Sequence, residues 1–260
     1  MTWRKLIASL LLLAFAGLHV MGWWWMRDWT GLVWAGGCLA AVTALWARWG
    51  WARWFALGIG VTGVVGCAGV LLALPSSAFA VGDRPFLAGQ ALAFSALAAV
   101  LSGRRMREAY EQRAGWPASG WRDRTLGLAV ICSVGISAML LRRFGLWWHG
   151  EQPLHLLGSG LALLAAVFGA ILTYRRRTAG LLLLGLAGGA AVIAGVDSVR
   201  SVLFLAPRID GQACSLDAWQ AYQRLAHAAM AGAGLATGAL TALAALAVFL
   251  GPMIAFLRRR

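Results

Sequence analysis

Four histidines are the side chains of this chain best suited to metal chemistry, and all of them fall on one side of the predicted helix pattern. They are His19, His149, His155 and His227. Methionine and cysteine collect on the same side, at Met21, Met26, Met139, Met230 and Cys214. Imidazole and thioether groups bind copper, and pairs of imidazoles hold haem iron. The pattern predicts a metal site built by His19, His155 and His227, with His149 at its mouth.

Two ligands and one simpler alternative fit these histidines. Copper would use the imidazole and thioether groups together, whereas haem b would need two histidines at facing depths, for which His155 and His227 are the best pair. The simpler alternative is that the histidines occupy hydrated positions near a membrane surface and that methionine fills apolar space.

Asp197 and Arg200 are the only opposite charges well inside a predicted helix. Their spacing of three residues puts both side chains on one helix face. Ionisable groups within a membrane are costly and often functional, so the pair is a candidate site. The alternative is a local ion pair that only satisfies itself.

Several kinds of chemistry are excluded by what the sequence lacks. Lys5 is the only lysine, at the start of the first apolar stretch, so Schiff-base chemistry with retinal or PLP is not expected. The cysteines form no C-x-x-C pair, and Cys38, Cys67 and Cys132 are expected to pack as small apolar residues. The stretch Gly58–Gly63 matches G-x-G-x-x-G, but it lies within an apolar helix, where we interpret it as a packing face.

The elements that must position these residues are membrane helices. The chain is 61% hydrophobic and 12% charged, which is more apolar than a soluble domain of 260 residues. Continuous apolar runs near the length of a membrane span predict helices rather than barrel strands. The predicted spans are Lys5–Trp25, Trp29–Ala47, Trp54–Leu74, Pro85–Ser102, Thr125–Leu141, Pro153–Tyr174, Thr178–Leu205 and Ala221–Leu257. The fold class is therefore an all-α, polytopic bundle of about eight transmembrane helices, or of six or seven if a short run is re-entrant.

The arginines orient this bundle. Most of the 23 Lys and Arg residues fall at the ends and loops that share a side with the N-terminus, as the positive-inside rule requires of the cytoplasm. Tryptophans cluster at both predicted boundaries, for example Trp23–Trp25 and Trp46–Trp54. We therefore expect a multi-pass protein of a bacterial inner membrane with both termini cytoplasmic, and a first helix that is kept rather than cleaved. Topology and anionic lipid explain the net charge of +14, so no nucleic-acid partner is expected.

The organisation predicted is one membrane domain over residues 1–260, without a soluble domain. A weak internal similarity carries Gly22-x-Trp24-Trp25 onto Gly145-x-Trp147-Trp148 and suggests two similar four-helix halves, 1–124 and 125–260. Transporters often carry such repeats and bind at their interface. Glycines spaced along helix faces predict close helix contacts. They are Gly60, Gly63, Gly66 and Gly69, the pair Gly185 and Gly189, and the pair Gly234 and Gly238.

Two family resemblances involve the same histidines. The segment His149–Gly160, with Leu18-His19, resembles the copper-resistance D family, which has a G-H element, an L-H-L-L helix and a histidine in its first span. This chain lacks the tryptophan and paired glycines usual after that histidine; the resemblance would imply copper handling at the periplasmic face. His155–Ser159 with Gly169 and Arg175–Arg177 also resembles a rhomboid protease helix, with Ser159 in place of asparagine. That resemblance would imply intramembrane hydrolysis, with Ser159 beside His227.

The function predicted first is transport or copper handling, with a site at the periplasmic face between the spans that carry the histidines and the Asp197–Arg200 pair. The alternative is a non-catalytic assembly or anchoring subunit that binds other membrane subunits. A haem-b redox subunit and an intramembrane hydrolase are further alternatives. We assign no catalytic residue and favour a role other than catalysis, with the lipid bilayer and other membrane subunits as the expected partners.

Overall fold

The computed structural model describes residues 2–26, 29–73, 83–111, 121–148, 153–209, 231–246 and 248. Over these ranges the chain is helical apart from short turns and has no strand, which confirms the predicted all-α class. Lipid offers no hydrogen-bonding partners, so a continuously apolar run is stable only when its backbone groups pair within a helix. The labelled helices are α1 (Thr2–Met26), α2 (Trp29–Trp46), α3 (Gly50–Ala73), α4 (Asp83–Ser102), α5 (Arg104–Glu111), α6 (Trp121–Trp148), α7 (Pro153–Tyr174) and α8 (Thr178–Ile209).

Seven of the described helices are long and apolar enough to cross a membrane, namely all labelled ones except α5. A shorter apolar helix, Ala231–Leu246, lies within the eighth predicted span. The protein is therefore a multi-pass helical membrane bundle. The fifth prediction ended too early, at Leu141, because α6 continues through Arg142 and Arg143 to Trp148.

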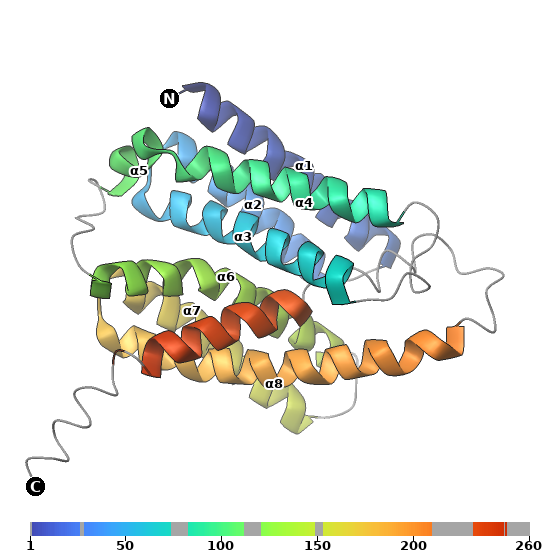
Figure 1. Ribbon diagram of the computed structural model, residues 1–260. Helices are drawn as coiled ribbons and strands as arrows, with labels where there is room; N and C mark the ends of the chain where they lie inside the picture. Colours follow the sequence, from blue (N-terminus) through green and yellow to red (C-terminus); the bar gives the residue numbers. More distant parts are fainter. Residues whose placement is uncertain are drawn as a thin grey trace, which may run out of the picture.

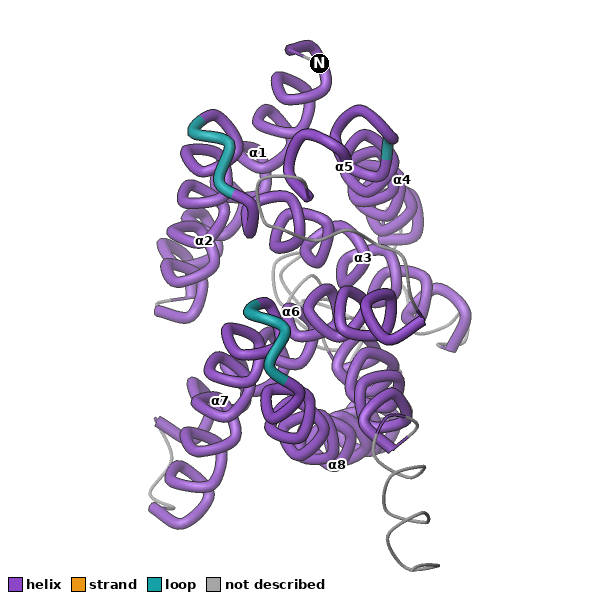
Figure 2. Tube along the Cα trace, turned by 90° about the vertical axis from the view of Figure 1, so that its left-hand side faces the viewer, coloured by secondary structure: helices purple, strands orange, loops and turns teal. Residues whose placement is uncertain are grey.

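The helices form two groups that follow the chain order (Figures 1 and 2). The first half comprises α1 to α5, and the second comprises α6, α7, α8 and the helix Ala231–Leu246. The halves meet chiefly where α3 packs on α6. Gly58 permits this approach, because a Cβ atom at Gly58 would lie 2.9 Å from the carbonyl oxygen of Ile131.

The α2–α3 and α7–α8 turns have the same geometry. Arg48 and Arg176 adopt positive φ angles of 58° and 61°, in the left-handed region that usually takes glycine at helix ends. The amide of Trp49 donates to the Ala44 carbonyl at 2.9 Å, and the amide of Arg177 donates to Leu172 at 2.8 Å. The two halves thus share a helix-end motif under a shift that carries Arg48 onto Arg176. The predicted shift carried Gly22 onto Gly145 instead, so the repeat stays a prediction.

One end of the molecule is lined with exposed arginines, and we call it the arginine-rich end. Its members are Arg48, Arg104, Arg105, Arg107 and Arg175–Arg177. The short helix α5 packs here, and its Met106 and Tyr110 are fully buried against the first half. On the outer face of α5, Arg104 pairs with Glu108 at 2.8 Å, and this hydrogen bond raises the pKa of Arg104.

Two cations at the same end are buried among aromatic rings. Lys5 is 5% exposed, and its Nζ atom lies 5.8 Å from the ring centre of Trp46 and 5.7 Å from that of Tyr110. Arg53 donates from Nε to the Leu101 carbonyl at 2.9 Å and lies over the ring of Trp54. Aromatic faces attract cations in this way, so these contacts join the ends of α1 and α3 to neighbouring helices of the first half.

Close helix contacts occur at several of the predicted glycines. A Cβ atom at Gly60 would lie 3.1 Å from the Phe94 carbonyl oxygen of α4, and one at Gly238 would collide with the backbone of Gly188. The predicted close helix contact is wrong for Gly69 and Gly189, because a Cβ atom at either would have no heavy atom within 4 Å. On α8 the predicted Gly185 does make a close contact, because a Cβ atom there would lie 2.9 Å from that of Ala245, and Gly188 makes another.

Candidate functional site

The predicted histidine cluster falls only partly within the described residues. His19 is half-buried on α1, whereas His155 is exposed at the start of α7. The cavity that His19 lines does not include His155. His149 and His227 lie outside the described residues, so the four-histidine site stays a prediction. Within the described ranges, no three His, Cys, Asp or Glu side chains lie close enough to hold a metal ion.

Asp197 forms an ion pair across two helices. Its Oδ2 atom lies 3.2 Å from a guanidinium nitrogen of Arg143 on α6. Arg143 also donates to the Ala194 carbonyl at 3.3 Å, so one side chain joins α6 to α8 at two points. The predicted partner Arg200 lies on α8, but its side chain is outside the described part. Arg143 was not predicted as a partner of Asp197, because the fifth predicted span ended at Leu141.

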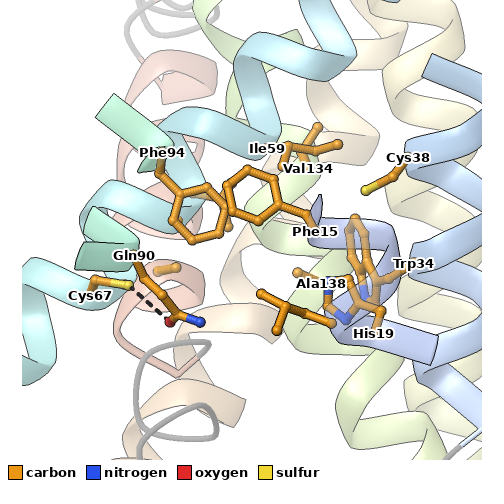
Figure 3. Close-up of a pocket in the computed structure, with 15 residues that line it drawn as sticks. Phe15, His19, Trp34, Cys38, Ile59, Cys67, Gln90, Phe94, Val134 and Ala138 are labelled. Carbon is orange, nitrogen blue, oxygen red and sulfur yellow. Dashed lines mark hydrogen bonds between the residues drawn. The ribbon is translucent and has the colours of Figure 1, made fainter. Parts of the chain in front are cut away.

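A cavity of about 130 Å³ lies between the two halves, and it is the best candidate for a site in the described structure (Figure 3). Five labelled helices, α1 to α4 and α6, contribute to its walls, and Ala233 closes it from the helix Ala231–Leu246. It lies beside the contact between α3 and α6, because Ile59 and Val134 line it. Binding sites of membrane transporters often occupy this position between two halves.

Aromatic rings form much of the cavity wall. The rings of Phe15 and Phe94 stack with centres 4.2 Å apart and planes 17° apart. The Phe94 ring rests directly on Gly63, where any larger residue would collide with it. On the other side, the ring of Trp34 lies 6.4 Å from that of His19 (Figure 3). The site is thus apolar and aromatic, as small-molecule sites usually are.

A few polar groups interrupt this apolar lining. The hydroxyl oxygen of Thr62 is buried and has no hydrogen-bond partner among the described residues. Gln90 places its amide oxygen 4.0 Å from the Cys67 sulfur, and His19 adds an imidazole (Figure 3). An unpaired buried hydroxyl costs free energy, so a ligand that bonds to Thr62 would recover that cost.

A second cavity, of about 500 Å³, opens between the halves toward the arginine-rich end. We call it the groove. Its walls come from α2, α3, α6 and α7, and Arg175 stands at its edge. Trp34 and Val134 line both the groove and the first cavity. These two side chains therefore separate the two spaces.

No family model, curated protein or solved structure matches this chain. The resemblances to the copper-resistance D family and to rhomboid proteases stay predictions. Of the residues that carry them, Ser159 is buried within α7, and its neighbour Gly160 faces the ring of Phe144. Both features suit helix packing.

His19 was predicted as a site residue, but its neighbours in the cavity were not. Thr62, Gln90 and Phe94 were not singled out. One signal was available: Gln90 is an uncharged polar side chain well inside a predicted span, where an amide needs a partner. Cys38 and Cys67, which we predicted to be packing residues, are buried and also line the cavity.

Proposed function

We propose that the protein is a transporter of a small organic molecule across a bacterial inner membrane, with the arginine-rich end in the cytoplasm. The observation that carries the proposal is the cavity at the contact between the two halves. A site in this position opens to one side or the other when the halves rock against each other. The polar groups of His19, Thr62 and Gln90 would orient the bound molecule.

The lining sets the class of molecule. Stacked aromatic rings favour a flat or compact apolar body, and three polar side chains favour one or two hydrogen-bonding groups on it. None of the described residues that line the cavity is an acid, lysine or arginine. A strongly charged ion would therefore lack a counter-charge, so the substrate is a neutral or weakly polar organic molecule.

Copper is less well supported as the cargo than such an organic molecule. His19, Cys38 and Cys67 offer ligands that copper accepts, and all three line the cavity. These three side chains do not converge on a single point. In the described structure, no three His, Cys, Asp or Glu side chains lie close enough to hold a metal ion. Copper analysis of the purified protein distinguishes the two cargoes: about one copper per chain would contradict the organic substrate.

Transport is tested by asking from which side of the membrane Cys67 can be reached. The variant keeps Cys67 and replaces Cys38, Cys132 and Cys214 by serine. Right-side-out and inside-out vesicles are treated with the impermeant reagent MTSET, and modification of Cys67 is measured by peptide mass spectrometry. A transporter that alternates should be modified from both sides.

A cross-link between the halves sharpens this test. Gly58→Cys and Val134→Cys are added at the contact between α3 and α6. A Cβ atom at position 58 would lie 2.9 Å from that of Val134, so the two helices must separate by about 1 Å to reach the usual Cβ–Cβ distance of a disulfide. Oxidation should leave Cys67 open to one side only, and reduction should restore access from both. A parallel variant that keeps only Cys132, which is buried on α6 and does not line the cavity, should stay unmodified.

The assembly-subunit alternative gives a different result. If Cys67 reacts no faster than Cys132 from either side, the cavity is closed and transport is contradicted. Access from one side only, unchanged by the cross-link, would show a fixed pocket and would also contradict transport. A closed cavity together with fixed partner subunits that co-purify would support the scaffold role.

A further inference from the structure

The groove between the halves has one charged end and an apolar length. Trp51, Tyr174 and Arg175 line it near the arginine-rich end, while Trp34 and Val167 lie deeper. From Val167 to Tyr174 it follows two turns of α7, roughly 10 Å at 1.5 Å per residue. Val167 and Ile171 are 43% and 45% exposed, so one side of the groove is open along the apolar flank of the bundle.

The chemistry of the lining is simple. The Ser133 hydroxyl donates to the Val130 carbonyl at 2.7 Å, so the one hydrogen bond that it can donate is made within α6. Among the described residues that line the groove, Arg175 is the one that carries a charge. It directly follows the last residue of α7 and is exposed. Arg176 and Arg177 add positive charge on the same turn, so this end attracts an anion.

We propose that the groove is a binding site for an anionic phospholipid, whose phosphate pairs with Arg175 and one of whose acyl chains lies along α7 toward Trp34. Clusters of basic residues on the cytoplasmic side of membrane helices bind anionic headgroups in this way. Trp51 and Tyr174 lie at the depth where amphipathic rings meet headgroups. The open flank beside Val167 lets the lipid enter from the bilayer without leaving it. The site does not depend on the transport function proposed above.

The test compares two lipids that differ in headgroup charge. Detergent-purified protein is titrated with phosphatidylglycerol or phosphatidylcholine carrying the same acyl chains, and bound lipid is counted by native mass spectrometry. Wild-type protein should bind one phosphatidylglycerol molecule saturably, in preference to phosphatidylcholine. Arg175→Gln should weaken this binding by about fivefold, which is the contribution of one arginine at a membrane surface. Val167→Trp should abolish saturable binding, because the indole fills the path of the acyl chain.

Matched variants control for general effects. Arg105→Gln removes an exposed charge from α5 at the same end, and Leu164→Trp adds an indole to an exposed position of α7 that does not line the groove. Neither should change binding. Retained α-helical circular dichroism and a monodisperse elution profile show that each variant is folded.

Three results would overturn the proposal. If both lipids bound equally and Val167→Trp weakened both alike, the groove would bind acyl chains without distinguishing the charge of the headgroup. Binding unchanged in both Arg175→Gln and Val167→Trp would place the lipid elsewhere. A shift from dimer to monomer in Val167→Trp, with lipid binding intact, would show that a second copy of the chain covers the groove.

Discussion

Tyr110 fastens α5 to the first half through a single hydroxyl. Its side chain is fully buried, and its hydroxyl donates to the Leu45 carbonyl at 2.5 Å. Tyr110→Phe should lower the free energy of unfolding by about 1 kcal/mol, the usual net value of a buried hydrogen bond. Tyr110→Ala should cost about 3–5 kcal/mol, because it also leaves a cavity. Both values can be measured by reversible unfolding in mixed detergent micelles with increasing SDS.

The control for Tyr110 is Arg105→Gln, an exposed change on the same short helix that should leave stability unchanged. If Tyr110→Phe matched the wild type while Tyr110→Ala was strongly destabilised, the ring and not the hydroxyl would hold α5 in place.

Asp197 is expected to matter little for stability despite its position near the end of a span. The carboxylate is 51% exposed, and exposed ion pairs contribute about 0–1 kcal/mol. Asp197→Asn should therefore lower the thermal unfolding midpoint by only a few degrees at most, as followed by tryptophan fluorescence. A larger fall would show that Asp197 contributes more than its exposed pair with Arg143 accounts for. Arg104→Gln, which breaks an exposed pair on α5, provides the comparison and should have no measurable effect.

At the scale of the elements, replacing either of two neighbouring glycines of α8 by alanine should have opposite effects on stability. A Cβ atom at Gly188 would lie 2.8 Å from the Gly238 carbonyl oxygen, so Gly188→Ala forces the two helices apart at a cost of about 1–3 kcal/mol. A Cβ atom at Gly189 meets nothing within 4 Å, and alanine favours a helix by up to about 1 kcal/mol over glycine. SDS titration should show Gly188→Ala destabilised and Gly189→Ala as stable as the wild type or more so. Equal behaviour of the two variants would contradict the close contact between α8 and Ala231–Leu246.

The helices themselves were predictable because an apolar run in lipid has few alternatives to a helix. Pro153–Tyr174 was predicted with the bounds that the structure shows, since Pro153 begins the apolar run and Arg175 follows its end. The end of α6 was not predictable in this way. Arg142 and Arg143 look like a boundary in sequence, yet Arg143 stays within the helix by reaching Asp197 and a carbonyl of α8. Such a partner is invisible until the helices are placed side by side.

The cavity was harder to predict for a related reason. His19, Thr62, Gln90 and Val134 come from four different helices, and no spacing within one helix relates them. The histidine cluster was inferred from membrane side alone, which fixes depth but not the position of a helix around the bundle. The side of the membrane on which a histidine falls therefore could not show that His19 faces Trp34 while His155 is exposed at the start of α7.

At the scale of the whole molecule, the contact between the halves determines the shape of both the cavity and the groove. Val134 of α6 and Trp34 of α2 line the cavity and the groove, so movement of α3 against α6 would change the two together. Gly58 is a point of close approach in this contact, since a Cβ atom there would meet both Val134 and the Ile131 backbone. A rocking motion would need this narrow interface to stay intact but not rigid.

We expect the two halves to assemble when they are made as separate chains cut between Glu111 and Trp121. Each half packs its own helices together, and the α3–α6 contact joins them. Co-expressed halves, with an affinity tag on one, should co-purify at a one-to-one ratio. Gly58→Phe should reduce the recovered complex by roughly fivefold or more, because overpacking of about 1–3 kcal/mol falls directly on the interface. Gly69→Phe, on the same helix but with open space around it, should assemble like the wild type. Full recovery with Gly58→Phe would show that the halves are held together elsewhere, and the rocking contact would have to be sought outside α3 and α6.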